Sequence, residues 1–264
     1  MSVSISADGT AISYTKQGSG AAVILVGGAL DDGSENAGLA DALAADFTVI
    51  NYSRRGRGES GDTLPYDVQR EIEDLAALTS IVGGASHVYG VSSGAALALR
   101  SAAAGVPITK LGLFEAPYPV DSTAIERWRA YRAELNRAEI GPGEMVAAFM
   151  QLAGSAEDEI TVARHHPVWR QLMTVADTLR YDAACLGDGP PTPEFLAKVR
   201  QPVLVATGTL PDPHMGSLQP GYFDAAADLL ARYLPRAERH VFAGQSHIAD
   251  PALVARELRR FFGP

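Results

Sequence analysis

Six short apolar runs, most of them rich in β-branched residues, recur along the chain and are separated by helical patterns or longer segments. Their sequences are "AAVILVGGA" (21–29), "DFTVINYS" (46–53), "SHVYGVS" (86–92), "TKLGLFEAP" (109–117), "QPVLVATG" (201–208) and "RHVFAGQ" (239–245). Strands that are apolar on both faces are typical of a parallel sheet covered by helices on both sides. The spacing therefore predicts an α/β fold built on such a sheet.

The start of the chain has a different pattern. Two short alternating runs, at 3–5 and 12–14, flank the turn signal "ADGT" and predict an antiparallel hairpin. With the six apolar runs, this makes a mostly parallel, eight-stranded sheet. Apolar residues at helical spacing predict helices over 67–82, 94–105 and 251–262.

One interval lacks a strand pattern. Between Glu115 and Gln201 lie about 85 residues with amphipathic runs at 123–138 and 168–187, which predict helices. We expect residues 117–199 to form a helical cap inserted after the sixth strand, and residues 1–116 and 200–264 to form the core. The alternative is that these helices simply pack on the rim of the sheet.

Charge and composition limit the partners. The net charge of −9 opposes a nucleic-acid partner, and the cluster Arg54-Arg55-Gly56-Arg57 is interpreted as a solvated or structural loop. The first residues do not resemble a signal peptide and no long apolar span occurs, so a cytoplasmic protein with no membrane partner is expected. The single cysteine, Cys185, has no partner for an internal disulfide. We expect a small, uncharged or weakly charged ligand and no cofactor.

The segment "YGVSSGA" (89–95) fits the pattern G-x-S-x-G, with Ser92 at its centre. A predicted strand precedes it and an Ala-rich helix follows it, which is the context that a nucleophile requires in this motif. Side chains at Gly90 and Gly94 would collide with the flanking elements of so sharp a turn. Ser92 is therefore the candidate nucleophile, and Ser93 is expected to contribute mainly its backbone N–H.

A serine hydroxyl needs a base to remove its proton. His247 lies between the last predicted strand and the final helix, which returns it to the same sheet edge as Ser92, and it is the candidate base. His214 is a weaker candidate. Structural or surface roles are expected for His87, His165, His166 and His240.

These pieces together make the sequence similar to the α/β-hydrolase superfamily over essentially its whole length. The matching segments are "GVSSGA" for the nucleophile elbow, "GQSH" for the catalytic histidine, "VILVGGA" for the oxyanion turn and "RRGRGES" for an R-G-x-G-x-S loop. The resemblance implies an oxyanion hole made by the backbone N–H groups of Ala29 and Ser93. Two positions depart from the usual pattern: Gly27-Gly28 replaces His-Gly, and Val91 precedes the nucleophile, where a histidine or an aromatic residue is common.

The third member of a Ser-His-acid triad has two candidates. The resemblance implies an acid after the seventh strand or, in some members, after the sixth. Asp212 follows the seventh strand, but four residues after Gly208, where three is the common spacing. Glu115 ends the sixth strand, where certain haloalkane dehalogenases with a similar fold carry a catalytic glutamate. We favour Glu115 and retain Asp212 as the alternative.

The predicted function is cleavage of a carboxylic ester or similar acyl bond of a small, apolar substrate through an acyl-enzyme. A cofactor-free perhydrolase or haloperoxidase would use the same residues, and a hydrolase-fold ligand-binding protein would keep the pocket without turnover. Gly56 to Gly61 also fits the dinucleotide pattern G-x-G-x-x-G, but Pro65 delays the helix that this motif requires. Insert residues that either line the pocket or pack between cap and core are Trp128, Tyr131, Phe149, Met150, Trp169 and Met173.

Overall fold

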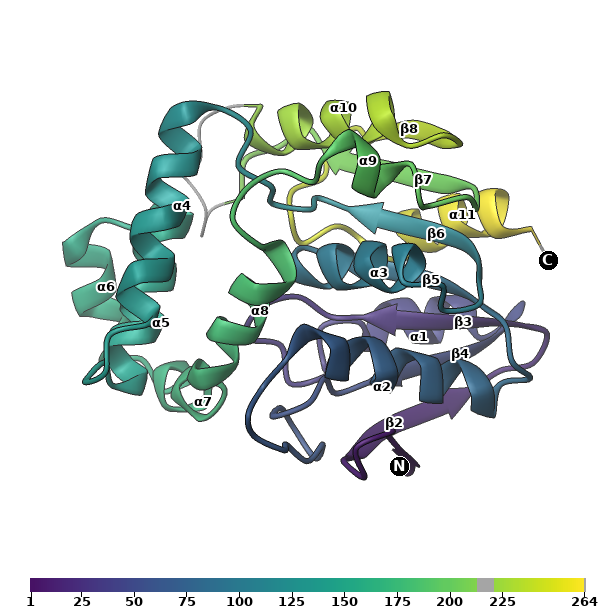
Figure 1. Ribbon diagram of the computed structural model, residues 1–264, viewed down its shortest axis with the longest axis horizontal. Coiled ribbons are helices and arrows are strands. Elements are labelled where there is room, and N and C mark those ends of the chain that lie inside the picture. The colour runs from purple at the N-terminus through teal and green to yellow at the C-terminus, as the bar shows by residue number, and fades with distance from the viewer. Residues whose placement is uncertain (213–220, 264) are drawn as a thin grey trace.

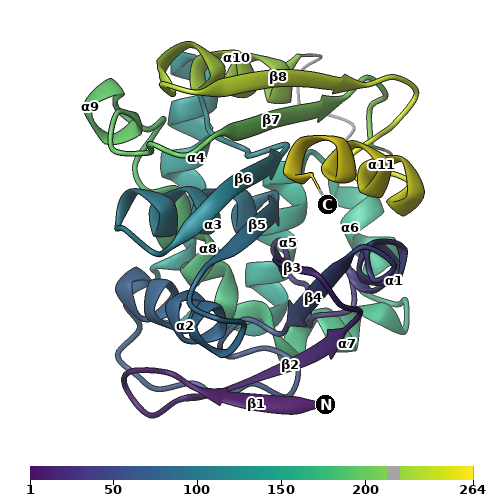
Figure 2. The ribbon, with the colours of Figure 1, turned by 90° about the vertical axis from the view of Figure 1, so that its right-hand side faces the viewer.

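The computed structural model describes residues 1–212 and 221–263 and contains one eight-stranded sheet. Its strands follow the spatial order β1-β2-β4-β3-β5-β6-β7-β8 (Figures 1 and 2). β1 and β2 pair antiparallel, as do β2 and β4, and the remaining neighbours pair parallel. The predicted hairpin and mostly parallel sheet are confirmed. The strands are β1 (Ser2–Ile5), β2 (Ala11–Gln17), β3 (Ala21–Val26), β4 (Phe47–Tyr52), β5 (Ser86–Val91), β6 (Ile108–Phe114), β7 (Val203–Gly208) and β8 (Ala237–Phe242).

Helices cover both faces of this sheet, as expected for strands that are apolar on both sides. α1 (Ala37–Leu43) and α11 (Pro251–Phe262) pack on one face. On the other face lie α2 (Val68–Ile81), α3 (Ser93–Ala103) and α10 (Tyr222–Tyr233). No helix in the described residues is both long enough and apolar enough to cross a membrane.

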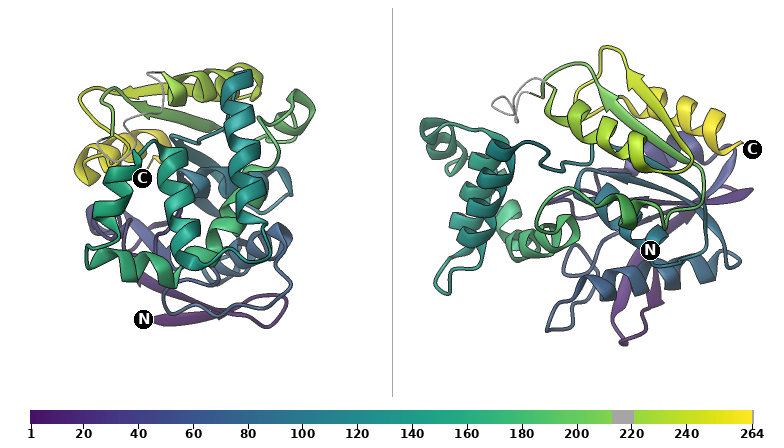
Figure 3. Two further views of the ribbon diagram at one scale, coloured as in Figure 1. Left: turned by 90° about the vertical axis from the view of Figure 1, so that its left-hand side faces the viewer. Right: turned by 45° about the horizontal axis from the view of Figure 1, so that its top comes forward.

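Residues 117–199, between β6 and β7, are called the insert. Most of the insert stands beside the sheet, on the side to which the parallel strands point (Figures 1 and 3). The division of the chain into core and cap remains our interpretation. The helices of the insert are α4 (Ser122–Leu135), α5 (Pro142–Ala153), α6 (Glu157–Ala163), α7 (Val168–Thr174), the 3₁₀ helix η1 (Ala176–Thr178), α8 (Leu179–Leu186) and α9 (Pro193–Leu196).

The amphipathic run at 168–187 is not one continuous helix. It breaks at Val175, whose φ of −114° and ψ of 7° are not helical, and η1 then leads into α8. The Thr178 hydroxyl donates to the Val175 carbonyl at 2.6 Å. Ala176 and Thr178 are buried, and η1 packs against α5, so tertiary packing overrides the helical periodicity here.

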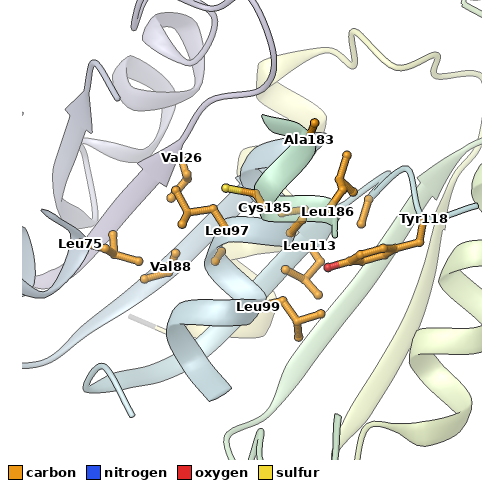
Figure 4. Close-up of a cluster of buried hydrophobic side chains, with 14 of the residues drawn as sticks. Val26, Leu75, Val88, Leu97, Leu99, Leu113, Tyr118, Ala183, Cys185 and Leu186 are labelled. Carbon is orange, nitrogen blue, oxygen red and sulfur yellow. The ribbon is translucent and has the colours of Figure 1, made fainter. Parts of the chain in front are cut away.

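The main hydrophobic core joins the insert to the sheet. Figure 4 shows Ala183, Cys185 and Leu186 of α8 in one cluster with Leu97 of α3 and Leu113 of β6. Full burial of one such large apolar side chain stabilises a fold by about 1.5–3 kcal/mol. α8 is thereby held firmly against α3, the helix that begins directly after Ser92.

Candidate active site

Ser92 occupies a strained turn between β5 and α3. Its φ of 55° and ψ of −127° lie outside the regions that non-glycine residues usually adopt. Such a conformation costs of order 1–3 kcal/mol and persists only where the surroundings enforce it. The Ser92 N–H donates to the Phe114 carbonyl at 3.0 Å, which ties the turn to β6. The turn places the serine at the carboxyl edge of the sheet and at the positive end of α3.

Two glycines make this turn sterically accessible. A Cβ on Gly90 would lie 2.5 Å from the Gly94 carbonyl oxygen. A Cβ on Gly94 would lie 2.4 Å from the carbonyl oxygens of both Gly27 and Val26. All of these distances are far below a carbon–oxygen contact, and the obstacles are backbone atoms that cannot swing away. The predicted steric requirement at both positions is confirmed.

His247 contacts the carboxylate of Glu115. His247 Nδ1 lies 2.6 Å from Glu115 Oε2, and the two side chains are 7% and 3% exposed. The other oxygen, Oε1, accepts the Gly208 N–H at 2.8 Å, so the end of β7 fixes the carboxylate. Glu115 itself adopts a φ of 47°, a second non-glycine residue with positive φ at this sheet edge. The arrangement fixes the imidazole with its Nε2 away from the carboxylate.

Asp212, the alternative acid, lies four residues beyond the end of β7 and is buried, with 5% of its surface exposed. Of the two candidate carboxylates, Glu115 is the one whose contact with the imidazole is defined at hydrogen-bonding distance. The catalytic assignment of either residue remains a proposal.

The other histidines have separate surroundings. His87 lies in β5, and its ring stacks on Phe262 with a centroid separation of 4.6 Å. His214 lies outside the described residues. His165 and His166 are exposed on the insert, and His240 lies in β8.

The turn after β3 brings Ala29 next to Ser92 and Ser93. The Gly28 N–H is engaged by Glu35 Oε2 at 2.9 Å, while the Gly28 carbonyl accepts from Arg57. Ala29 lines the same cavity as Ser92 and Ser93. Ser93 opens α3, and the N–H groups of a first helical turn have no intrahelical acceptor. The two predicted oxyanion donors therefore lie beside one cavity.

That cavity lies between the core and the insert, and its walls are largely apolar. Three of the six insert residues considered from the sequence, Trp128, Tyr131 and Phe149, line it together with Ser92. The other three contribute to packing instead: Trp169 is buried, and Met150 and Met173 are partly buried against the main core. The cavity is also lined by residues that sequence patterns did not single out, among them Leu152, Asp182, Leu186, Tyr222 and Phe223.

Phe223 connects the cavity to the histidine. It lines the cavity with Ser92, and its ring stacks on the His247 imidazole with a centroid separation of 5.0 Å and an interplanar angle of 12°. Within residues 1–212 and 221–263, no hydrogen bond joins the Ser92 hydroxyl to His247. The structure thus brings His247 and Glu115 into contact at the sheet edge that holds Ser92, and Phe223 separates the imidazole from the cavity that Ser92 lines.

The arginine cluster after β4 is buried rather than solvated. Arg54, Arg55 and Arg57 are 0–2% exposed. Arg54 forms a two-pronged ion pair with Glu71, at 2.7 and 2.8 Å, and contacts Asp182 at 2.7 Å. The structural alternative for this loop is therefore the correct one, and its three arginine side chains form a buried scaffold of ion pairs.

Cys185 lies beside this scaffold, 3.6 Å from both Arg54 Nη2 and Glu71 Oε1. Burial and the nearby Glu71 carboxylate raise the pKa of its thiol to about 12. The side chain is therefore a neutral thiol at physiological pH and contributes packing rather than a nucleophile.

Three features of the fold and the site indicate the class of the protein. A strained turn holds a serine after the fifth strand, a histidine follows the eighth strand, and a cavity lies under the inserted helices. The model of the Alpha/beta hydrolase family matches residues 23–258, and the chain belongs to this family. A comparison with curated protein sequences gave no match.

Solved structures agree with this assignment. An alpha/beta hydrolase from Sphaerobacter thermophilus is 40% identical over 99% of this chain and 100% of that chain, with a TM-score of 0.82. An esterase from Thermogutta terrifontis is 21% identical over 99% of this chain and 97% of that chain, with a TM-score of 0.70. A bromoperoxidase from Bacillus anthracis is 17% identical, covers 100% of each chain and has a TM-score of 0.70. The likeness to the last two proteins shows the fold alone.

Proposed function

We propose that the protein is a serine hydrolase that cleaves a carboxylic ester or similar acyl bond of a small, apolar substrate. The observation that carries this proposal is the 2.6 Å contact between His247 Nδ1 and Glu115 Oε2 at the sheet edge that also holds Ser92. A carboxylate on Nδ1 orients the imidazole and stabilises the imidazolium that forms when the ring takes up a proton.

In the proposed mechanism, His247 Nε2 removes the proton from the Ser92 hydroxyl as the serine oxygen attacks the substrate carbonyl. Catalytic hydrogen bonds are often long in unliganded enzymes and tighten when substrate binds. The present absence of a Ser92–His247 hydrogen bond is compatible with this sequence of events. Substrate entry beside Phe223, which contacts the imidazole, is the expected trigger for closer approach.

The carbonyl oxygen becomes negative as the tetrahedral intermediate forms, and the N–H groups of Ala29 and Ser93 would accept that charge. One such donor contributes about 3–4 kcal/mol in comparable sites. Collapse of the intermediate breaks the ester C–O bond, and the imidazolium returns its proton to the departing alcohol. Water then attacks the acyl-enzyme with His247 again as base, releasing the acid and Ser92.

The cavity walls support an uncharged, apolar acyl or aromatic group. Trp128, Tyr131 and Phe149 contribute aromatic surface to the cavity. The charged group among the lining residues, Asp182, is already paired with Arg54 and Arg57 at 2.7 and 2.8 Å. Because those pairs neutralise its charge, we do not expect a cationic substrate.

A fluorophosphonate probe tests the reaction class directly. It should label the wild-type protein at Ser92, identified by mass spectrometry, and a panel of p-nitrophenyl esters of increasing chain length should define the acyl preference. Ser92→Ala should abolish labelling and lower ester turnover by about 10⁶-fold. Substantial ester turnover by folded Ser92→Ala would refute the proposal, and a wild type that neither reacts nor turns over would favour a ligand-binding role.

A perhydrolase or haloperoxidase is the second candidate, because one structural neighbour is a bromoperoxidase and the same Ser-His-acid set would serve. Bromination of a phenolic dye in the presence of peroxide, acetate and bromide distinguishes it from an esterase. A rate of bromination that exceeds ester hydrolysis and disappears in Ser92→Ala would favour this alternative.

A further inference from the structure

The buried loop after β4 contacts both elements that carry the expected oxyanion donors. We infer that Arg57 and Asp182 are positioning residues for the oxyanion hole, so that α8 of the insert controls the geometry of catalysis in the core. The inference rests on the proposed function. It begins from two contacts: Arg57 Nη1 donates to the Gly28 carbonyl, and Arg57 Nη2 pairs with Asp182 Oδ1 at 2.8 Å.

The first contact sets the direction of the Ala29 N–H. In a trans peptide, the carbonyl of one residue and the N–H of the next point in opposite directions. When Arg57 holds the Gly28 carbonyl, the Ala29 N–H must therefore point away from Arg57. Ala29 lines the cavity beside Ser92, whereas Arg57 does not, so the guanidinium lies behind the turn. The guanidinium of Arg57 therefore orients the Ala29 N–H without contacting the substrate.

The second donor is held by the same carboxylate oxygen. Asp182 Oδ1 accepts from the Ser93 hydroxyl at 2.7 Å, in addition to Arg57 and Arg54. The Ser93 side chain is buried, with 2% of its surface exposed. Asp182 thus fixes the first residue of α3 directly and the turn after β3 through Arg57. A shift of Asp182 would move both donors relative to Ser92.

The choice of arginine at position 57 has a geometric reason. The two terminal nitrogens of a planar guanidinium diverge and can hold two acceptors in fixed directions, whereas a lysine ammonium is a single point. Arg57 uses one nitrogen for Gly28 and the other for Asp182. Its partner is anchored as well, because α8 packs on α3 and contributes Ala183, Cys185 and Leu186 to the core (Figure 4).

The test uses the full chain with Arg57→Met and Arg57→Lys. For each variant, kcat and KM are measured with a p-nitrophenyl ester, and the inhibition constant is measured for an alkyl trifluoromethyl ketone. Such a ketone forms a hemiketal with the serine and places an oxyanion in the hole. Arg57→Met should lower kcat/KM about 10²-fold, with KM within about threefold, and weaken the ketone by a similar factor. Arg57→Lys keeps the positive charge but should still lose at least about tenfold in kcat/KM and in ketone affinity. If Arg57→Met does not fold, Arg57→Lys provides the test of the inference.

Arg55→Met is the matched control. Arg55 is equally buried and is two residues away, but it pairs with Asp74 at 2.7 Å and with Asp8 at 3.0 Å. Its loss should lower thermal stability and leave KM, kcat and the ketone affinity near wild type. Unchanged ketone affinity in a folded Arg57 variant would overturn the inference, as would an equal loss in Arg55→Met. A wild type without ester turnover overturns the proposed function, and the inference with it.

Discussion

Glu115 and His247 meet across the end of β7, with Glu115 Oε2 at 2.6 Å from His247 Nδ1 and Glu115 Oε1 at 2.8 Å from the Gly208 N–H. The glutamate comes from the end of β6 and the histidine from the loop after β8. The end of β7, which lies between them, binds one oxygen of the carboxylate, and the other oxygen contacts the imidazole. This relationship is why we propose Glu115 as the acid of the triad, with Asp212 as the alternative.

Replacement of that acid by its amide is the first prediction. Glu115→Gln should lower kcat by about 10³–10⁴-fold while the protein stays folded, because the amide no longer stabilises the imidazolium or enforces the correct tautomer. Ester turnover and circular dichroism are measured in parallel for Asp212→Asn. If Asp212→Asn loses more activity than Glu115→Gln, the assignment of the acid is wrong.

A methyl group at the elbow should be poorly tolerated. In Gly94→Ala the new Cβ would lie 2.4 Å from two backbone carbonyl oxygens, so the turn that presents Ser92 must shift. We expect a loss of about 1–3 kcal/mol in the free energy of unfolding and a clear fall in kcat. Gly189→Ala is the control, because a Cβ there meets no atom within 4 Å. Wild-type urea unfolding and turnover in Gly94→Ala would contradict the packing argument.

Breaking the buried ion pair between Arg54 and Glu71 of α2 should destabilise the fold far more than breaking a more exposed pair on α2. Burial alone would raise the pKa of Glu71, but Arg54 and its hydrogen bonds lower it to about 2. Glu71→Gln leaves the Arg54 charge partly uncompensated and should cost about 3–5 kcal/mol in the free energy of unfolding. Glu73→Gln breaks the more exposed pair with Arg70 and should cost less than about 1 kcal/mol. Comparable urea midpoints for Glu71→Gln and Glu73→Gln would contradict a larger cost for breaking the buried pair.

The buried His87 should lower the free energy of unfolding as the solution becomes acidic. Burial, and secondarily the charge of Lys110, lower the pKa of His87 to about 4, compared with 6.5 for an unperturbed histidine. Between these values the unfolded chain binds a proton that the folded protein does not, so stability falls as the pH drops from 6.5 to 4. The loss should be on the order of 2 kcal/mol.

Urea unfolding at several pH values checks this expectation. His87→Asn should show a flatter dependence over that window, while His165→Asn, which removes an exposed imidazole, should follow the wild type. An identical pH slope in wild type and His87→Asn would rule out His87 as the source.

The cavity wall formed by Phe149 should set the acyl preference. Phe149→Ala enlarges the cavity and should raise kcat/KM for long-chain relative to short-chain p-nitrophenyl esters by about tenfold, since each methylene in an apolar pocket changes discrimination by roughly 10-fold or more. Met150→Ala changes the next residue of α5, which does not line the cavity. An equal change in chain-length preference for both variants would indicate general loosening of the insert.

Much of the fold and part of the candidate site were predictable from local patterns. Periodicity reports which faces of a strand or helix are buried, so the six apolar runs identified the parallel strands. Gly90 and Gly94 around Ser92 identified the sharp turn, because only a residue without a side chain fits so close to other backbone. His247 followed from topology, since a loop after a parallel strand must lie at the same edge as the elbow.

The tertiary structure alone decided which residues from distant elements contact one another. Glu115 and Asp212 both lie beyond strand ends, so the local sequence left both as candidates for the acid. Glu115 contacts the Gly208 N–H and the His247 ring, and neither contact is encoded by the local sequence. The buried arginines after β4 had the composition of a surface loop, because burial of a charge depends on partners elsewhere in the chain. Asp182 was hidden in an amphipathic run that breaks before it, and its role emerges only when α8 packs on α3. Local sequence therefore determined the strands and the sharp turn that holds Ser92, the candidate nucleophile, and three-dimensional packing determined how the charges are paired around them.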